Sequence, residues 1–261
     1  MMCFPPEALV FLRNIELFCV MYEKTRGVVL YTHPYNDTLS VVHVYTERFG
    51  RMSYMLPRGV GRAAKMARAL YMPLALLDME VEVRPGRHTQ RIREAHSFLP
   101  LMHIQGDPVR SSLAMFLSEF LGSVLRGGES QPLLFAYIAR SVQLLDALES
   151  GLGNFHICFL VGLTSYMGIT PNVESFSPGY YFDMQEGVFV SHRPLNNPFL
   201  PPMEAAFMVK LMRINYVNMR RFRFSRGERR IILDRILSYY ALHYTGMGQL
   251  SSPAVLHALF D

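Results

Sequence analysis

The chain has 261 residues, which suits one large or two small domains, and half of them are hydrophobic, which is enough for a substantial core. Its formal charge of +5 is only mildly basic, so the distribution of charge is more informative than its sum. The three cysteines, Cys3, Cys19 and Cys158, are scattered and form no CxxC pair, which excludes a zinc site built on cysteine and favours reduced thiols in a cytoplasmic protein.

The first twenty residues are apolar but are interrupted by two prolines and several charges. They therefore make a poor signal peptide, and they are too charged to span a membrane. We expect residues 1–20 to be an extension upstream of an initiator at Met21. The alternative is a short amphipathic helix, Glu7–Met21, docked on the domain that follows. No uncharged run elsewhere reaches the length of a membrane span, so we expect no membrane partner.

Three runs rich in β-branched and aromatic residues follow, at 28–32, 39–46 and 51–56. The break at 33–37, His-Pro-Tyr-Asn-Asp, is typical of a turn, because proline fixes φ and asparagine and aspartate tolerate tight backbone. Phe49-Gly50 separates the second run from the third. Three short strands joined by short turns predict an antiparallel meander.

Two further strands complete the pattern. In the run 73–83, Met79 and Val81 alternate with Glu80 and Glu82, as in a half-buried strand. The run 90–96 is expected to point Ile92 inward and its arginines outward. Five strands with a long link before the fourth predict an oligonucleotide/oligosaccharide-binding (OB) barrel, which binds single strands across its face and loops.

From Pro108 the hydrophobic period changes from two to 3.6. Helices are predicted over 108–124, 132–148, 154–167, 203–212 and 228–242, with a last turn from Pro253 through Leu256 and Phe260. All three of the first helices are apolar over more than one face, which indicates a bundle. Between the third and fourth, residues 171–202 contain a predicted hairpin at 180–183 and 187–190. The fold class is therefore α+β: a five-stranded barrel, then a helical bundle with an inserted hairpin.

The segment 26–54, RGVVLYTHPYNDTLSVVHVYTERFGRMSY, resembles the opening of the RecO family of bacterial DNA-repair proteins almost residue for residue. The fragments 73–80, 154–156, 179–183 and 211–216 resemble the version found in Bacteroidetes-type bacteria. The resemblance covers residues 21–261. It implies an extension at 1–20, an OB-fold nucleic-acid-binding domain at 21–100 and a helical domain at 101–261. In many members the insertion carries four zinc-binding cysteines, whereas 171–202 has none, so contacts among Tyr180, Tyr181, Phe182, Phe189 and Phe199 are expected to replace the metal.

The resemblance also implies a function. Proteins of this family are recombination mediators that bind single- and double-stranded DNA, anneal complementary strands and contact the tail of the single-stranded-DNA-binding protein (SSB). With RecR they help to load RecA, in the cytoplasm at the nucleoid. Two alternatives remain open: an OB-fold RNA-binding or ribosome-associated factor, and a protein-binding adaptor with the barrel as its scaffold.

Basic residues gather in two windows, 48–93 and 210–235, which together contain 19 of the 26 lysines and arginines. This concentration favours a polyanionic partner over ordinary solvated surface. The loop 57–68 is rich in glycine and carries four cations, which suits contact with a nucleic-acid backbone. The expected DNA-binding residues of the barrel are Arg51, Arg58, Arg62, Lys65, Arg68, Arg84, Arg87, Arg91 and Arg93. Tyr31, Tyr45, Phe49 and Tyr54 could stack on bases or fill the core.

The second window contains a dense arginine cluster with Phe222 and Phe224 between its members. Ser225 followed by Glu228 predicts a capping box, so a helix should start there. The cluster could contact DNA, or it could receive the acidic, apolar tail of SSB, as the family resemblance allows. In a third interpretation its arginines form local ion pairs and both phenylalanines lie in the core. The candidate residues are Arg220, Arg221, Arg223, Arg226, Arg229 and Arg230.

Catalytic motifs are absent from the sequence. It contains no G-x-S-x-G, HExxH or Walker A pattern, and its nine histidines are dispersed. His43 and His156 are interpreted as structural residues. We expect no enzymatic activity, no cofactor and no metal, because strand annealing requires only neutralised phosphates and exposed bases.

Overall fold

The computed structural model describes residues 21–61, 68–125 and 129–260, with side chains up to Leu256. The expectations for residues 1–20, for Arg62 and for Lys65 lie outside these ranges. The chain forms two compact units. The first consists of residues up to 101 together with 125–135, and the second consists of residues 102–124 together with 136 onwards. Within the described ranges, no helix is both long enough and apolar enough to cross a membrane.

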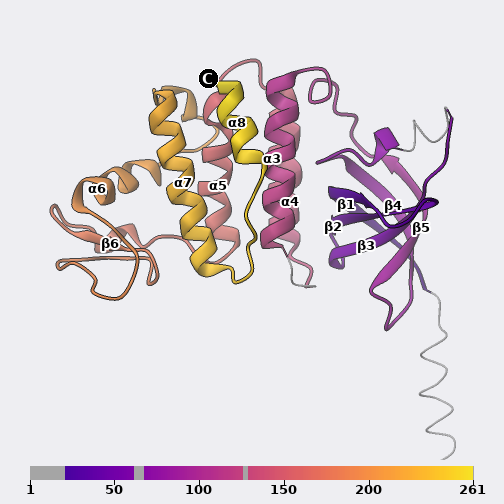
Figure 1. Cartoon of the computed structure of the whole chain (residues 1–261), viewed down its shortest axis with the longest axis horizontal. Helices are drawn as coiled ribbons and strands as arrows, with labels where there is room; N and C mark the ends of the chain where they lie inside the picture. The colour runs from indigo at the N-terminus through magenta and orange to yellow at the C-terminus, as the bar shows by residue number, and fades with distance from the viewer. Residues whose placement is uncertain (1–20, 62–67, 126–128, 261) are drawn as a thin grey trace, which may run out of the picture. The chain divides into compact units, whose positions relative to one another are not determined.

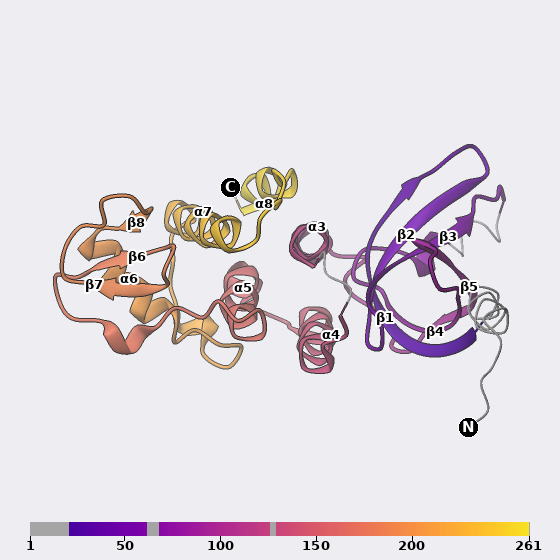
Figure 2. The ribbon, with the colours of Figure 1, turned by 90° about the horizontal axis from the view of Figure 1, so that it is seen from below.

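The first unit is a closed five-stranded barrel, as predicted (Figure 2). Its strands are β1 (Met21–Pro34), β2 (Leu39–Thr46), β3 (Gly50–Pro57), β4 (Leu76–Val83) and β5 (Thr89–Ser97). The order around the barrel is β1-β2-β3-β5-β4, and every pair is antiparallel except β3 with β5. Closure pairs every strand on both edges, which removes the exposed edges that an open sheet would present.

Alternation along the strands fills the barrel interior. Seven side chains form its core: Val29, Val42, Val44, Tyr54, Leu77, Met79 and Val81. Burial of a valine or leucine side chain stabilises a fold by about 1.5–3 kcal/mol, so this small core is a main source of stability. At Gly27 a Cβ atom would lie 2.4 Å from Val44 Cγ1, so only glycine allows the strands to approach so closely.

A β-bulge in β1 decides which side chains reach the outside. The pairing with β2 shifts between Val29 and Tyr31, and the bulge leaves Leu30 buried. An extra residue in one strand of a pair redirects the side chains that follow it. Beyond the bulge, Tyr31 lies opposite His43, and both side chains lie on the outer face of the barrel.

The second unit is a helical bundle, also as predicted. Five of its helices run side by side in Figure 1: α3 (Pro108–Val124), α4 (Pro132–Ala147), α5 (Phe155–Tyr166), α7 (Arg226–His243) and α8 (Ser252–Phe260). Aromatic rings link them. Phe120 of α3 meets Tyr240 of α7 edge-on, with ring centroids 4.9 Å apart, and the Tyr240 hydroxyl donates to the Leu160 carbonyl of α5 at 2.8 Å. Cys158 is buried in this core, as expected.

The C-terminal helix, α8, agrees with the turn predicted from Pro253 to Phe260 and starts one residue earlier, at Ser252. Glu119 of α3 holds its start. Its carboxylate accepts hydrogen bonds from the backbone N–H groups of Ser251 and Ser252, both at 2.9 Å, and so satisfies donors at the start of α8. This contact joins residues more than a hundred positions apart, and local periodicity cannot reveal it.

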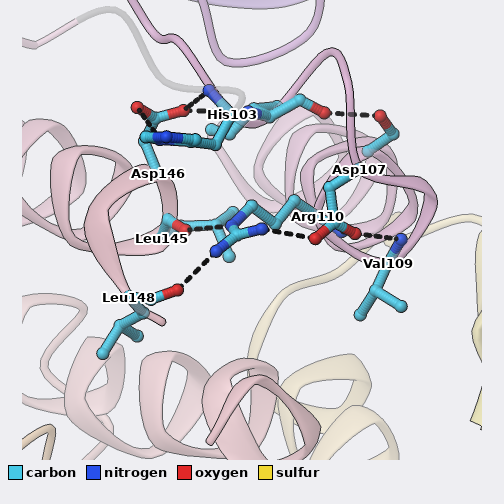
Figure 3. A network of polar contacts seen from close by, with 9 residues as sticks. His103, Asp107, Val109, Arg110, Leu145, Asp146 and Leu148 are labelled. Carbon is cyan, nitrogen blue, oxygen red and sulfur yellow. Dashed lines mark hydrogen bonds and ion pairs between the residues drawn. The ribbon is translucent and has the colours of Figure 1, made fainter. Parts of the chain in front are cut away.

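Asp146 and Arg110 tie the chain to the bundle where it enters α3 (Figure 3). Asp146, near the end of α4, accepts hydrogen bonds from the backbone N–H groups of residues 102–104 at 2.8–2.9 Å. Arg110 forms an ion pair with Asp107 and donates to the Leu145 carbonyl at 3.3 Å. Burial acts to raise the pKa of Asp146, but the three N–H donors outweigh it and hold the pKa below its usual value.

A small three-stranded sheet follows α5, in the order β7-β6-β8. It consists of β6 (Tyr181–Asp183), β7 (Val188–Val190) and β8 (Phe199–Leu200), and it leads into α6 (Pro202–Leu211). The sequence predicted only a hairpin and missed β8, because two residues flanked by prolines carry no strand signal.

Aromatic contacts stabilise this sheet, as predicted. The rings of Phe182 and Phe189 lie 4.9 Å apart, and those of Tyr181 and Phe199 lie 5.6 Å apart. Tyr239 of α7 packs against the same core. Among the described residues, no group of three or more His, Cys, Asp or Glu side chains gathers that could hold a metal ion.

Candidate nucleic-acid interface

Five of the arginines expected to bind DNA are exposed on the barrel and its loops. Four of the five have no carboxylate within ion-pair distance among the described residues. One of them, Arg58, donates to the Asn36 carbonyl in the β1–β2 turn at 3.0 Å. We call this set the barrel arginines: Arg58, Arg68, Arg87 and Arg91. Their charge is available to a ligand, which is the first requirement for contact with a phosphate backbone.

Two other expected residues are already paired. Arg84 forms an ion pair with Glu82, and Arg93 pairs with Glu80 at 2.9 Å. The Arg93 guanidinium also lies 5.1 Å from the centre of the Tyr22 ring. The alternation that sends the glutamates of β4 outward therefore also places them beside outward arginines. Because a glutamate partly neutralises each of them, Arg84 and Arg93 should attract a phosphate group less strongly than the barrel arginines do.

Arg51 has a structural role in the barrel. Its guanidinium donates to the Tyr31 hydroxyl at 2.6 Å and to the Leu125 carbonyl at 3.3 Å, and it lies 5.6 Å from the centre of the Tyr31 ring. These contacts hold the side chain partly buried. Arg51 positions Tyr31, and its charge lies beside the rings described next.

Three rings meet on the outer face of β1 and β2, and we call Tyr31, His33 and His43 the ring cluster. The centroids of Tyr31 and His43 lie 4.3 Å apart, and those of His33 and His43 lie 5.2 Å apart with their planes only 17° from parallel. The Nδ1 atom of His43 lies 2.9 Å from the Ser53 hydroxyl of β3. Burial, the charge of Arg51 and the proximity of His33 lower the pKa of His43 to about 4, so its ring is neutral at pH 7.

The structure separates the four aromatic residues that the sequence proposed for base stacking. Tyr45 and Tyr54 are buried, and Phe49 packs against the barrel core. Of the four, Tyr31 is the one partly exposed ring on the outer face, since Tyr45 on that face is covered by Phe135. His33 was not predicted as a site residue because its position suggested a turn, whereas β1 continues to Pro34. The period-two spacing of Tyr31 and His33 was the signal that could have identified both.

The second basic cluster, residues 218–230, is fixed by side-chain hydrogen bonds at two points. The predicted capping box is confirmed, since the Ser225 hydroxyl accepts from the Glu228 N–H and the Glu228 carboxylate accepts from the Ser225 N–H. Asn154, buried at the start of α5, donates to the carbonyls of Met219 and Phe222 at 3.0 and 2.7 Å. These bonds hold the loop that carries the arginines against the bundle.

The arginines of the second basic cluster lie in different environments. Arg229 is half-buried and donates to the Phe224 carbonyl at 2.8 Å. Arg220 packs over Gly151, where a Cβ atom would lie 2.9 Å from its Cγ atom. The exposed members are Arg220, Arg221, Arg223, Arg226 and Arg230. Phe222 and Phe224 are half-buried, with ring centroids 5.6 Å apart, so they are neither fully exposed platforms nor core residues.

An apolar groove lies beside this cluster. It has a volume of about 310 Å³ and is lined by the small sheet, α6 and α7. Met203, Phe207 and Ile231 line it and are exposed to solvent. The rings of Phe207 and Phe224 have centroids 5.9 Å apart, so the groove continues into the second basic cluster. The charged residues in its lining are Glu204, Glu228 and Arg235, of which Arg235 pairs with Glu204 at 2.9 Å, so any excess of positive charge comes from the adjoining second basic cluster.

Comparisons with known proteins assign both units to one family. The family model for the N terminal part of Recombination protein O matches residues 21–98, and that for its C terminal part matches residues 105–253. The DNA repair protein RecO of Phocaeicola vulgatus is 40% identical over 241 residues, which cover 92% of this chain and all of the relative. RecO of Azobacteroides pseudotrichonymphae is 39% identical over the same share, and that of Porphyromonas gingivalis is 35% identical over 91% of this chain and 98% of its own.

Proposed function

The chain belongs to the RecO family of DNA repair proteins, and on that premise we propose that it is a recombination mediator that binds single- and double-stranded DNA and anneals complementary strands. In this proposal it works with RecR to load RecA onto SSB-coated DNA, in the cytoplasm at the nucleoid. The supporting observation is the set of barrel arginines, which are exposed and have no carboxylate partner among the described residues.

Annealing is a physical rather than a covalent task. Two strands repel each other through their phosphates, so a mediator must neutralise that charge and leave the base edges free to pair. Guanidinium groups suit this work because they bind phosphate oxygens in a bidentate manner and read no sequence. The barrel arginines meet that requirement without an active site.

A salt titration tests the electrostatic part of the proposal. If about six phosphates are neutralised, the log–log slope of single-strand affinity against salt should be about −4. The measurement is fluorescence anisotropy of a labelled oligothymidylate over a series of salt concentrations. A slope near zero would show that binding does not depend on phosphate contacts.

Charge reversal tests where the contacts lie. The quadruple variant Arg58→Glu, Arg62→Glu, Lys65→Glu, Arg68→Glu should fold and should lose annealing of SSB-coated oligonucleotides. The matched control reverses Arg140 and Arg193, which are exposed arginines outside both basic windows, and it should anneal normally. Normal annealing by the quadruple variant would show that the DNA-binding site lies elsewhere.

Gel shifts with single-stranded DNA and then with RNA distinguish a DNA mediator from an RNA-binding factor. Binding to neither would indicate a protein-binding adaptor.

The groove and the second basic cluster support a second part of the proposal, which is contact with the acidic, apolar C-terminal tail of SSB. The groove offers an apolar floor, and the arginines beside Phe224 offer positive charge at its edge. Exposed apolar side chains such as Met203 and Ile231 are costly to leave in water, and a bound peptide would cover them.

A labelled peptide of the tail sequence tests this contact. Ile231→Asp places a charge in the groove, and it should weaken peptide binding at least tenfold while leaving single-stranded DNA binding unchanged. Arg223→Glu should act in the same direction. The control is Leu195→Asp, at a side chain that is exposed outside the groove. Full peptide binding by both the Ile231 and Arg223 variants would contradict the assignment.

A further inference from the structure

We propose that the ring cluster is a stacking platform for unpaired bases, and that it lets the barrel distinguish single-stranded DNA from duplex. The inference rests on the proposed DNA-binding function and deepens it, because it adds a contact with the bases to contacts with the phosphates. Three observations carry it: the geometry of the rings, the neutral state of His43, and the cations of the outer face.

The geometry favours stacking. His33 and His43 lie nearly parallel, and Tyr31 completes the cluster from the adjoining position on β1. His33 is exposed, so one face of the cluster is open to a ligand. A flat ring held by its neighbours loses little conformational freedom when a base stacks on it. Base–aromatic stacking is also tolerant of sequence, as an annealing protein requires.

The rings are held in place by their neighbours, and His43 is held in the neutral form. Arg51 binds the Tyr31 hydroxyl, and Ser53 bonds to the His43 ring. Arg51 and His33 are the titratable groups that face His43, and together with burial they hold its pKa far below its ordinary value. A neutral imidazole presents an uncharged aromatic face to a base at physiological pH.

One cation contacts the platform and two others lie on the same outer surface. Arg51 lies 5.6 Å from the centre of the Tyr31 ring. Arg58, which follows β3, donates to the Asn36 carbonyl, three residues beyond His33 in the β1–β2 turn. The register runs from His33 of β1 to Val41 of β2, Met55 of β3 and Arg91 of β5, so Arg91 projects outward from the barrel as the rings do, two strands beyond β2.

This arrangement should let the barrel bind single-stranded DNA more tightly than duplex. Bases in a duplex are stacked and paired within the helix, so their faces cannot reach an external ring without unstacking, which costs a few kcal/mol. Phosphates are exposed in both forms and can reach the barrel arginines. The ring cluster should therefore strengthen binding to single strands alone, while the arginines bind both forms.

Variants at His33 test the platform in the full-length protein. His33→Ala should bind oligothymidylate about five- to a hundredfold more weakly, with unchanged affinity for duplex of the same length. His33→Phe should restore single-strand affinity because it restores a flat ring, whereas His33→Leu, which is apolar but not aromatic, should not. The control is Tyr22→Ala, which removes an exposed ring at the far end of β1 and should leave the ratio of affinities unchanged.

The chain contains no tryptophan, so His33→Trp would introduce a single indole at the platform. Stacking of a base on that indole should quench its fluorescence on addition of oligothymidylate, and duplex should not. A Tyr22→Trp variant reports whether quenching is specific to the ring cluster. Equal quenching at both positions, or equal quenching by duplex, would overturn the proposal.

The outcomes distinguish this inference from the function on which it rests. If the wild type binds oligothymidylate with the expected salt dependence, and His33→Ala and His33→Leu bind as tightly as the wild type does, only the platform is wrong. If the wild type binds no DNA at all, the proposed function and the platform are both wrong. A selective loss for single strands that His33→Phe restores supports the platform.

Discussion

The two basic regions of this protein hold similar numbers of arginines but use them differently. On the barrel, ion pairing sorts the charges: Arg93 pairs with Glu80, while Arg91, opposite Glu82 in the register, forms no ion pair among the described residues, and Glu82 pairs with Arg84. In the second basic cluster a loop and a helix start carry the arginines. There, Arg229 donates to the Phe224 carbonyl, and Arg220 covers Gly151. The density of charge along a sequence therefore does not reveal how much of it a ligand can reach.

The difference also concerns what lies beside the charges. The barrel carries the outward ring cluster as well as the barrel arginines, one of which, Arg58, donates to the turn that follows His33, and this combination suits a ligand with flat bases and many phosphates. The second basic cluster borders an apolar groove, which suits a peptide with a hydrophobic end and acidic residues. One chain thus offers two distinct surfaces for anions, and changes to either should affect one ligand and spare the other.

The largest expected effect comes from Asn154→Ala. This substitution removes two hydrogen bonds to buried or half-buried loop carbonyls, and an unsatisfied buried group costs about 1–3 kcal/mol. We expect urea denaturation to show a loss of that size. Binding of the SSB tail peptide should weaken while binding of oligothymidylate at the barrel stays the same.

Asn196→Ala, at an exposed asparagine in the loop before β8, is the matched control and should change neither property. Equal losses of peptide and DNA binding in the Asn154→Ala variant would mean that the two basic regions are not independent, and the comparison above would fail.

Most of the fold was predictable from the sequence, because its elements carry strong local patterns. The alternation in β4 and the 3.6-residue period in α3 both correspond to buried faces in the structure. The capping box at Ser225 marked the start of α7. The element that was missed, β8, has two residues between prolines and shows no local strand signal. The contact of Glu119 with Ser251 and Ser252 could not be predicted either, because it joins residues too far apart in the sequence for a local pattern to contain.

The candidate site was predictable only in part. Clustering along the chain identified the basic windows, but only the structure separates Arg91 from the ion-paired Arg93. The ring cluster was hidden because a bulge in β1 decides which residues face outward. Its histidines come from two strands, so no single window of sequence contains the whole cluster.

An effect of intermediate size should appear in acid. His43 has a pKa of about 4 in the folded protein, below its ordinary 6.5, so the unfolded chain binds a proton first as the pH falls. The stability that depends on a neutral His43 is complete above pH 6.5 and is lost as the pH falls toward 4. After allowance for solvent screening, the loss is about 1–2 kcal/mol.

His43→Phe keeps a ring but cannot titrate. Urea denaturation from pH 7.5 to pH 4 should show a smaller decline for the variant than for the wild type. The difference should be confined to pH values below about 6.5, since above it both rings are neutral. Parallel curves for the two proteins over the whole range would mean that His43 does not contribute to acid sensitivity.

The smallest expected effect tests most directly whether ion pairing on the barrel decides which arginines contact DNA phosphates. Arg91→Ala and Arg93→Ala remove exposed arginines two positions apart on β5, and each should change stability by less than about 1 kcal/mol. Arg91 has no carboxylate partner among the described residues, so its loss should reduce the log–log salt slope of single-strand binding by about 0.7, the value for one phosphate contact. Arg93 is partly neutralised by Glu80, so its loss should change the slope by much less. Equal changes in slope would show that the ion pair opens when DNA binds, and that pairing in the free protein does not decide which arginines contact phosphate.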